Sequence, residues 1–185
     1  MIAGVDFGSK LSGQTVVAIL DNDIIQVQRS EKGKDADDFL LGVLEATKIT
    51  LVGIDAPLSL PGLYLGNGSD YFFREADRDL GAMSPMFLGG LTARAIRIRD
   101  KLVMGGKNVI EVYPAIKILE LGCTTDDEPE MVIQKMLTQN HWSLNFTGKW
   151  DAHTRDSILA LMSAHAYNKG DYKSFGNKEE GMIYV

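Results

Sequence analysis

The chain has 185 residues, of which 45% are hydrophobic and 24% are charged, and its net charge is −6. These values are ordinary for a globular protein, and the length predicts a single domain over residues 1–185. One cysteine, Cys123, excludes an internal disulfide and a cysteine-built zinc site, and it fits a reducing cytoplasm, the predicted location. No apolar run approaches the roughly 20 residues of a membrane span, and the early Asp6 argues against a signal peptide.

The first part of the chain predicts an antiparallel meander followed by a helix and another strand. Short apolar runs separated by turn residues predict strands at residues 2–6, 14–20 and 24–29. Asp35 is positioned to N-cap a helix over about residues 36–48. The β-branched run of residues 49–55 then predicts a strand that is buried on both faces and that ends at Asp55. This change of pattern indicates a mixed sheet.

Glycines and prolines interrupt residues 58–90, which we interpret as an insertion of loop with a short helix over about residues 71–79. Beyond the insertion, helices and strands alternate. Helices are predicted over residues 92–104, 115–121, 129–138 and 151–168, strands over residues 108–113 and 181–185, and a polar loop over residues 141–149. The last strand is expected at an edge of the sheet.

Four acidic residues stand where burial is expected: Asp6 and Asp55 at strand ends, Glu111 inside a strand, and Asp156 in the first turns of the last helix. Crowded carboxylates repel each other and lose hydration, so such a group persists mainly where a divalent cation neutralises it. We therefore predict that all four bind Mg²⁺ or Mn²⁺, with Asp55 as the bridging ligand. The alternative is a set of separate turn caps and salt bridges.

Two residues near Asp156 need separate interpretations. Asp151 lies five residues away, about 140° around the helix, so we interpret it as the N-cap. His153 is a candidate catalytic residue that shuttles a proton or releases product, and its alternative is an ordinary surface histidine.

Basic residues concentrate between Arg74 and Lys107, where seven basic and four acidic residues give a charge of +3, so the remainder carries −9. This distribution is compatible with a phosphate-bearing partner such as nucleic acid. The candidate substrate-binding residues are Arg74, Arg78, Arg94 and Arg97. An internal salt-bridge network that holds the insertion is an equal alternative. Residues 71–73 (Tyr-Phe-Phe) suit stacking on bases, although a core anchor is the first expectation for them.

Six short motifs follow one another in a recognisable order. They are Gly4-Val5-Asp6-Phe7-Gly8, Gly53-Ile54-Asp55-Ala56-Pro57-Leu58, Arg74-Glu75-Ala76-Asp77-Arg78, Leu91-Thr92-Ala93-Arg94-Ala95-Ile96, Val109-Ile110-Glu111-Val112-Tyr113-Pro114 and His153-Thr154-Arg155-Asp156-Ser157. From Gly4 to about Ala166 the chain resembles the family called domain of unknown function 429, predicted nucleases with a ribonuclease H-like fold. The family more often has alanine where this chain has Ser157.

The resemblance implies an α/β fold with a ribonuclease H-like mixed five-stranded sheet: three antiparallel strands, then parallel strands, flanked by helices. The predicted function is a metal-dependent nuclease that hydrolyses phosphodiester bonds. One alternative is a non-catalytic nucleic-acid-binding or partner-binding protein with a relic site. Another is a nucleotide-dependent phosphotransferase of the actin-like or sugar-kinase type, because Asp6-Phe7-Gly8-Ser9-Lys10 resembles its first phosphate loop, although a second glycine-rich loop is missing. No membrane partner is expected, and a homodimer is one option for the oligomeric state.

Overall fold

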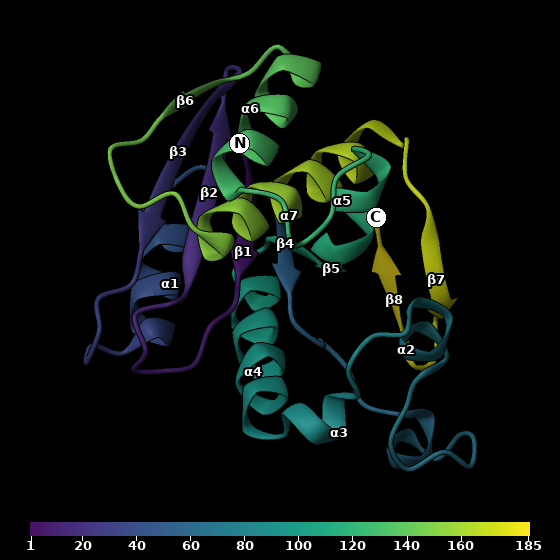
Figure 1. Ribbon diagram of the computed structural model, residues 1–185. Coiled ribbons are helices and arrows are strands. Elements are labelled where there is room, and N and C mark those ends of the chain that lie inside the picture. The colour runs from purple at the N-terminus through teal and green to yellow at the C-terminus, as the bar shows by residue number, and fades with distance from the viewer.

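Helices cover both faces of one eight-stranded mixed sheet in a computed structural model that describes residues 1–185 (Figure 1). The strands are β1 (Ile2–Asp6), β2 (Val16–Asp21), β3 (Ile24–Arg29), β4 (Leu51–Asp55), β5 (Asn108–Val112), β6 (Ser143–Asn145), β7 (Ser174–Asn177) and β8 (Gly181–Tyr184). The helices are α1 (Ala36–Glu45), the 3₁₀ turn η1 (Gly62–Leu65), α2 (Glu75–Leu80), α3 (Pro85–Leu88), α4 (Gly90–Met104), α5 (Pro114–Glu120), α6 (Pro129–Asn140) and α7 (Ala152–Lys169).

The order of strands across the sheet is β6-β3-β2-β1-β4-β5-β8-β7. Strands β1, β2 and β3 pair antiparallel, and β1, β4 and β5 run parallel, which confirms the predicted meander and the predicted change to parallel pairing. The prediction of five strands is wrong, because β6, β7 and β8 extend the sheet on both sides. Strand β6 lies inside the predicted loop at 141–149 and is too short to show an alternating pattern. Strand β8 is not the edge, because β7 pairs with its outer side.

Side-chain caps set where two helices begin. The carboxylate of Asp35 accepts hydrogen bonds from the backbone N–H groups of Asp37 (2.9 Å) and Asp38 (3.4 Å), and that of Asp151 accepts from Thr154 N–H (3.0 Å). Both predicted N-caps are confirmed. Helix α1 ends at Glu45, earlier than predicted, where the Thr47 hydroxyl donates to a carbonyl of the last turn.

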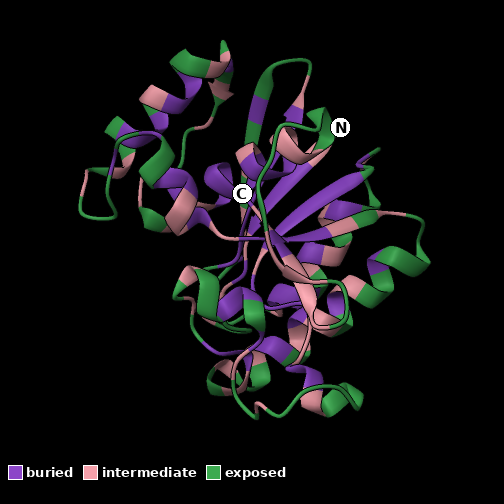
Figure 2. Ribbon diagram, turned by 90° about the vertical axis from the view of Figure 1, so that its right-hand side faces the viewer, coloured by how far each residue is buried: buried purple, intermediate pink, exposed green.

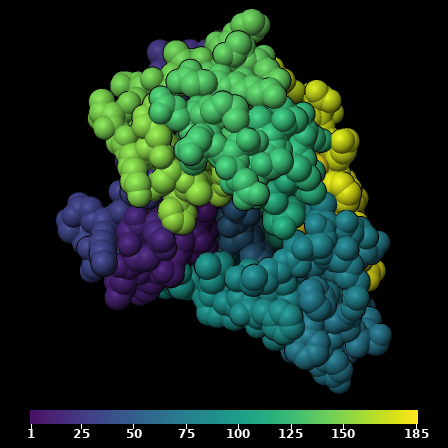
Figure 3. Space-filling model, viewed as in Figure 1, coloured from purple at the N-terminus to yellow at the C-terminus, as the bar shows by residue number.

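The insertion at 58–90 contains η1, α2 and α3 and projects from the body of the molecule (Figure 3). The helix predicted at 71–79 begins only at Glu75. The reason is local: the Asp70 carboxylate accepts hydrogen bonds from Phe72 N–H (2.7 Å) and Phe73 N–H (2.9 Å), which folds these residues into a turn. Local side-chain bonding therefore overrides the helical pattern at the start of this segment.

Two apolar layers enclose the sheet, whose central strands are buried (Figure 2). Helices α1 and α4 pack on one face, where Leu40 and Ile98 meet Ile54 of β4. Helices α5, α6 and α7 pack on the other face, where Ile133 and Ile158 meet strands β2 and β3. No helix in the structure combines the length and the apolar character needed to cross a membrane. The carboxyl ends of β1 and β4 open onto a pocket that is lined by the start of α4 and by residues of the insertion.

Candidate active site

Two aspartates lie side by side where the central parallel strands end. Asp6 is the last residue of β1 and Asp55 is the last residue of β4, and the two are direct partners in the parallel register. Each follows a glycine by two residues, Gly4 in β1 and Gly53 in β4. Because side chains alternate along a strand, Asp6 and Asp55 point to the same face of the sheet as these glycine positions, the face covered by α7.

The two glycines allow α7 to lie directly on the sheet backbone. A Cβ atom on Gly4 would lie 2.0 Å from the backbone nitrogen of Leu161, and one on Gly53 would lie 3.0 Å from the carbonyl oxygen of Ala160. Residue 161 therefore sits over β1 and residue 160 over β4. Any side chain at either glycine position would force the helix and the sheet apart.

Two functional side chains of α7 lie on the same sides of the helix as Leu161 and Ala160, one or two turns closer to its start, and so lie near the strand ends. His153 precedes Leu161 by two helical turns, in the row above β1, and Asp156 precedes Ala160 by one turn, in the row above β4. His153 Nδ1 lies 2.8 Å from Asp6 Oδ2. Asp156 and Asp55 line one small pocket of about 100 Å³. The structure thus brings Asp6, Asp55, Asp156 and His153 together, from three parts of the chain that are far apart in sequence.

Asp55 is the uncompensated charge of this group. Its carboxylate has no hydrogen-bond or ion-pair partner, although the residue is half-buried. Burial raises the pKa of Asp55 well above its usual value, and repulsion from Asp6, Asp156 and Glu111 adds to this rise. The neighbouring acids are each partly balanced, since Asp6 pairs with His153 and Asp156 Oδ1 accepts from Arg155 Nε at 2.9 Å.

The Asp6–His153 pair has its own electrostatics. Burial raises the pKa of Asp6, and the hydrogen bond to His153 offsets part of this rise. The hydrogen bond to Asp6 raises the pKa of His153, with burial opposing it. The imidazole is about one-third exposed, at 34%, so it can exchange protons with solvent while it stays oriented by Asp6.

Glu111 lines the strand-end pocket with Asp6 and Asp55, but its carboxylate is already paired. Its neighbours Ile110 and Val112 pack with Ala160 and Ala164 under α7, so the alternation of β5 directs Glu111 to the opposite face. There its carboxylate accepts two hydrogen bonds from Arg74, both 2.7 Å long, and one from the backbone N–H of residue 58 at 2.8 Å. The structure therefore does not bring Glu111 together with the three aspartates as a fourth free carboxylate, and the strand period already contained this information.

Arg74 is fully buried and has no donor left for a ligand. Its side chain donates to Asp77 twice, to Glu111 twice and to the Ser59 hydroxyl once, which uses all five guanidinium N–H groups. Burial acts to lower the pKa of Arg74, but the hydrogen bonds with Glu111 and Asp77 outweigh it and hold that pKa above its usual value. Of the two interpretations weighed for Arg74, the contacts are those of the internal salt-bridge network that ties the insertion to β5.

The other three candidate arginines differ in accessibility. Arg94 is mostly buried, pairs with Asp37 at 2.6 Å and lies over the Phe7 ring, 4.8 Å from its centroid. Arg97 shares the same Asp37 carboxylate at 2.6 Å, but its side chain is 53% exposed. Arg78 pairs with Asp70 at the surface and is also exposed. Arg78 and Arg97 are thus the two that solvent, or a ligand, can reach.

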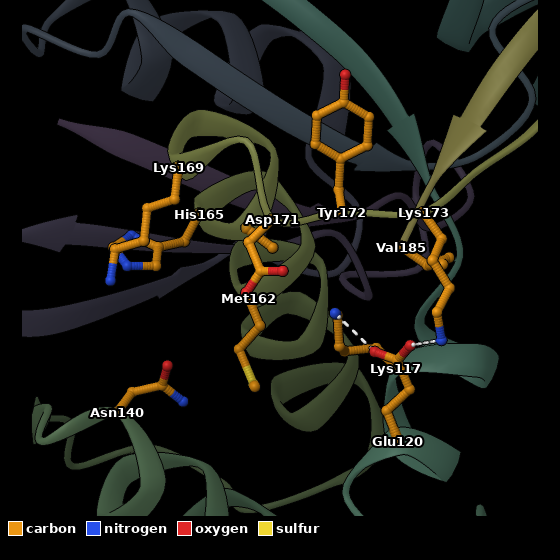
Figure 4. A pocket seen from close by; sticks show the side chains of 11 residues that line it. Lys117, Glu120, Asn140, Met162, His165, Lys169, Asp171, Tyr172, Lys173 and Val185 are labelled. Atoms are coloured by element: carbon orange, nitrogen blue, oxygen red, sulfur yellow. Dashed lines mark hydrogen bonds and ion pairs between the residues drawn. The ribbon is translucent and has the colours of Figure 1, made fainter.

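Two pockets differ sharply in what they offer chemically. A pocket of about 240 Å³ opens onto the strand ends and is lined by Asp6, Asp55 and residues of the insertion, and Figure 3 shows a hollow between the purple start of the chain, the teal insertion and the green segments above. A larger pocket, about 340 Å³, lies near the far end of α7 (Figure 4). There Lys117 and Lys173 both pair with Glu120 at 2.9 Å, so much of its charge is already balanced. The strand-end pocket is the one whose unpaired carboxylate, Asp55, is half-buried, since Asp171 in the larger pocket is exposed.

The acidic group has the donor chemistry of a hard-cation site but is not a complete cage. No group of three or more His, Cys, Asp or Glu side chains has the spacing of a ready-made metal site. Mg²⁺ commonly uses one or two carboxylates and completes its shell with water and substrate phosphate oxygens. The adjacent pair Asp6 and Asp55, with Asp156 opposite, fits that pattern of binding.

Sequence reasoning missed three residues that contribute to this site. Gly4 and Gly53 set the approach of α7, and the repeated pattern of glycine, apolar residue and aspartate at two strand ends was the signal that could have identified them. Tyr113, directly after β5, lines both pockets that contain Asp55, and burial, with the Asp55 charge second, raises the pKa of its hydroxyl. A tyrosine between a strand and a proline gives no such signal in the sequence.

Comparisons with known proteins add little to this geometry. No family model matches the chain, and no curated protein matches it. One match among solved structures is the Thermus thermophilus RuvC structure, with 15% sequence identity, coverage of 92% of this chain and 96% of that chain, and a TM-score of 0.48. A likeness this slight carries no weight for the site, which is described from its own contacts.

Proposed function

We propose that the protein is a divalent-metal-dependent nuclease of ribonuclease H-like fold that hydrolyses phosphodiester bonds in nucleic acid. The single observation that carries the proposal is Asp55: a half-buried carboxylate without a partner, beside Asp6 in register and facing Asp156. A protein that keeps such a charge unpaired sacrifices stability, and perturbed carboxylates of this kind concentrate at functional sites. The arrangement of β1, β2, β3, β4 and β5 supports the fold part of the proposal.

Three aspartates are the proposed ligands of Mg²⁺ or Mn²⁺: Asp6, Asp55 and Asp156. When bound, such an ion supplies a Lewis acid for a phosphoryl oxygen and lowers the pKa of a coordinated water. Asp55 stands between the other two and is the proposed bridging ligand. Glu111 contributes indirectly, since its paired carboxylate anchors Arg74 and so fixes the insertion that walls the pocket.

His153 is the proposed proton carrier. Its Nδ1 is held by Asp6, while the ring is open to solvent on one side. A histidine oriented by a carboxylate can take a proton from an attacking water or give one to a leaving oxygen. Its raised pKa keeps a protonated fraction present near neutral pH, which suits protonation of the leaving group.

The phosphotransferase alternative is weakened by the loop after β1. Nucleotide phosphates in that class bind to free backbone amides. Here the Gly8 N–H donates to the Thr15 hydroxyl at 3.2 Å, and a Cβ atom on Gly8 would lie 2.8 Å from the backbone of residue 14. The loop after β1 therefore packs against residues 14 and 15 of the same chain, and the Gly8 amide is not free to bind a ligand.

The test is direct incubation of the purified protein with labelled single-stranded, duplex, hybrid and branched nucleic acids in Mn²⁺ or Mg²⁺. Wild-type protein should cleave at least one of these, EDTA should stop cleavage, and Asp55→Asn should abolish it while the protein stays folded. Asp100→Asn, at an exposed aspartate of α4, is the matched control and should cleave normally. Cleavage by Asp55→Asn at the wild-type rate would refute the proposed role of this site.

A further inference from the structure

The insertion carries an exposed aromatic surface, made of Tyr71, Phe72, Met83 and Phe87. Their exposed fractions are 60%, 52%, 61% and 65%. Four of the five exposed large aromatic side chains of the molecule lie in residues 64–87, so the exposure is concentrated and not scattered. Exposed apolar patches of this kind mark binding sites.

The rings of this surface support one another. The Phe72 and Phe87 centroids are 5.6 Å apart with the rings tilted by 36°, and Phe73 meets Phe87 edge-on at 5.8 Å. The Arg78 guanidinium lies over the Phe73 ring, 5.4 Å from its centroid. The backbone beneath is fixed, because Asp70 caps the turn and the Ser84 hydroxyl bonds to the carbonyl of residue 72. Phe72 and Phe87 are thus presented to solvent on a supported turn, with a cation beside them.

The aromatic surface adjoins the acidic site. Met83 belongs to both: it is part of the exposed surface and it lines the strand-end pocket together with Asp6 and Asp55. The excess of cations lies on the neighbouring α4 segment: residues 91–107 carry +4, whereas residues 58–90 of the insertion carry −2. Arg78 and Arg97 are exposed, although each is paired with an aspartate. Flat rings, nearby guanidinium groups and a shared pocket wall are the features that stack bases beside a phosphate track.

We propose that the aromatic surface binds unpaired nucleotides of a single nucleic-acid strand and stacks their bases on Phe72 and Phe87, leading the strand toward Asp6 and Asp55. The inference rests on the proposed function and narrows its substrate to strands with unpaired bases, because paired bases cannot expose a face to a side-chain ring. The strand is favoured over a protein partner because Met83 joins the aromatic surface to the pocket that contains Asp6 and Asp55.

The test is fluorescence anisotropy in EDTA, where binding is measured without cleavage. The probes are labelled oligothymidine and oligoadenosine strands of about 15 nucleotides and a matched duplex. Phe72→Ala and Phe87→Ala should each weaken single-strand binding about tenfold, and Phe87→Trp should retain it. Met104→Ala, at an exposed apolar residue of the distant end of α4, is the control and should bind as wild type does. Urea unfolding midpoints should stay unchanged, because the replaced rings are exposed.

The outcomes separate this inference from the proposed activity. Loss of single-strand binding in the ring variants supports the aromatic surface even if no nucleic acid is cleaved in Mn²⁺, in which case only the proposed activity fails. Cleavage of single strands with unchanged binding in the ring variants overturns the inference and leaves the activity standing. A wild-type oligomer that Phe87→Ala converts to a monomer, without effect on nucleic acid, also overturns it and identifies the surface as a self-association face.

Discussion

Substitution of Gly4 by alanine should damage both the stability and the site, because helix α7 lies against the backbone of β1 at that position. The added Cβ would lie 2.0 Å from the Leu161 nitrogen and 2.4 Å from the Ser157 carbonyl oxygen, whereas ordinary contact begins at 3.4 Å. Strand and helix must therefore separate by about 1.4 Å, the difference between 2.0 and 3.4 Å. Overpacking against two backbone elements costs about 3 kcal/mol in the free energy of unfolding.

Two further glycines grade the effect. Gly53→Ala meets the Ala160 carbonyl at 3.0 Å, so a shift of a few tenths of an ångström suffices and the expected cost is about 1 kcal/mol. Gly42→Ala, in helix α1 with nothing within 4 Å of the new atom, is the control and should stabilise by about 0.5 to 1 kcal/mol. Urea unfolding measures all three, and Mn²⁺ binding should weaken in Gly4→Ala. A Gly4→Ala protein as stable as Gly42→Ala would refute the close packing of α7 on β1.

Three other changes follow from the charges. Arg74→Ala should destabilise the protein by about 3 to 5 kcal/mol in urea unfolding, because it leaves the buried carboxylates of Asp77 and Glu111 unpaired. Arg78→Ala, at an exposed arginine, should change stability by less than about 0.5 kcal/mol. Equal effects of the two substitutions would contradict the buried network. The pKa of Asp55 in the folded state is raised above 3.8, so the folded state retains a proton that the unfolded state releases, and stability falls as pH rises. In EDTA, Asp55→Asn should remove this fall in stability and melt at a higher temperature than wild type near pH 7. A lower melting temperature of Asp55→Asn at that pH would contradict the reasoning. The pKa of His153 in the folded state is raised above 6.5, so the stabilisation from its pairing with Asp6 is complete below pH 6.5 and is lost as pH rises through the folded pKa. His153→Asn should therefore destabilise the protein at about pH 5 but not at about pH 9. A loss of stability that does not depend on pH would count against the Asp6–His153 pair.

Much of the central fold could be predicted because each element carried a local signal. The apolar runs that end in Asp6 and Asp55 identified two parallel neighbours, and Asp35 and Asp151 marked helix starts that the structure confirms. The outer strands had no such signal. Strand β6 has three residues, and β7 contains a glycine and polar residues, so neither shows a hydrophobic period.

The positions of the acidic residues could be predicted from the sequence. The pairing of Glu111 with Arg74, which leaves the three aspartates as a separate group, could not. Asp6, Asp55 and Asp156 meet because strand ends and a helix start converge at one edge, which the order of elements already indicated. Glu111 was grouped with them from its burial and its motif, and it does line one pocket with Asp6 and Asp55. Strand alternation points it to the face opposite α7, where it pairs with Arg74. Its pairing with Arg74 depends on the path of a 33-residue insertion, and long-range pairing of this kind is not encoded in a local pattern.

Calorimetric titration of the protein with Mn²⁺ at neutral pH tests the central claim most directly. Wild type and Asp100→Asn should bind the ion with the same affinity, while Asp6→Asn and Asp55→Asn should each lose measurable binding and remain folded. Equal Mn²⁺ binding by Asp55→Asn and wild type, or no binding by wild type at all, would contradict the assignment of these strand-end aspartates as the metal ligands.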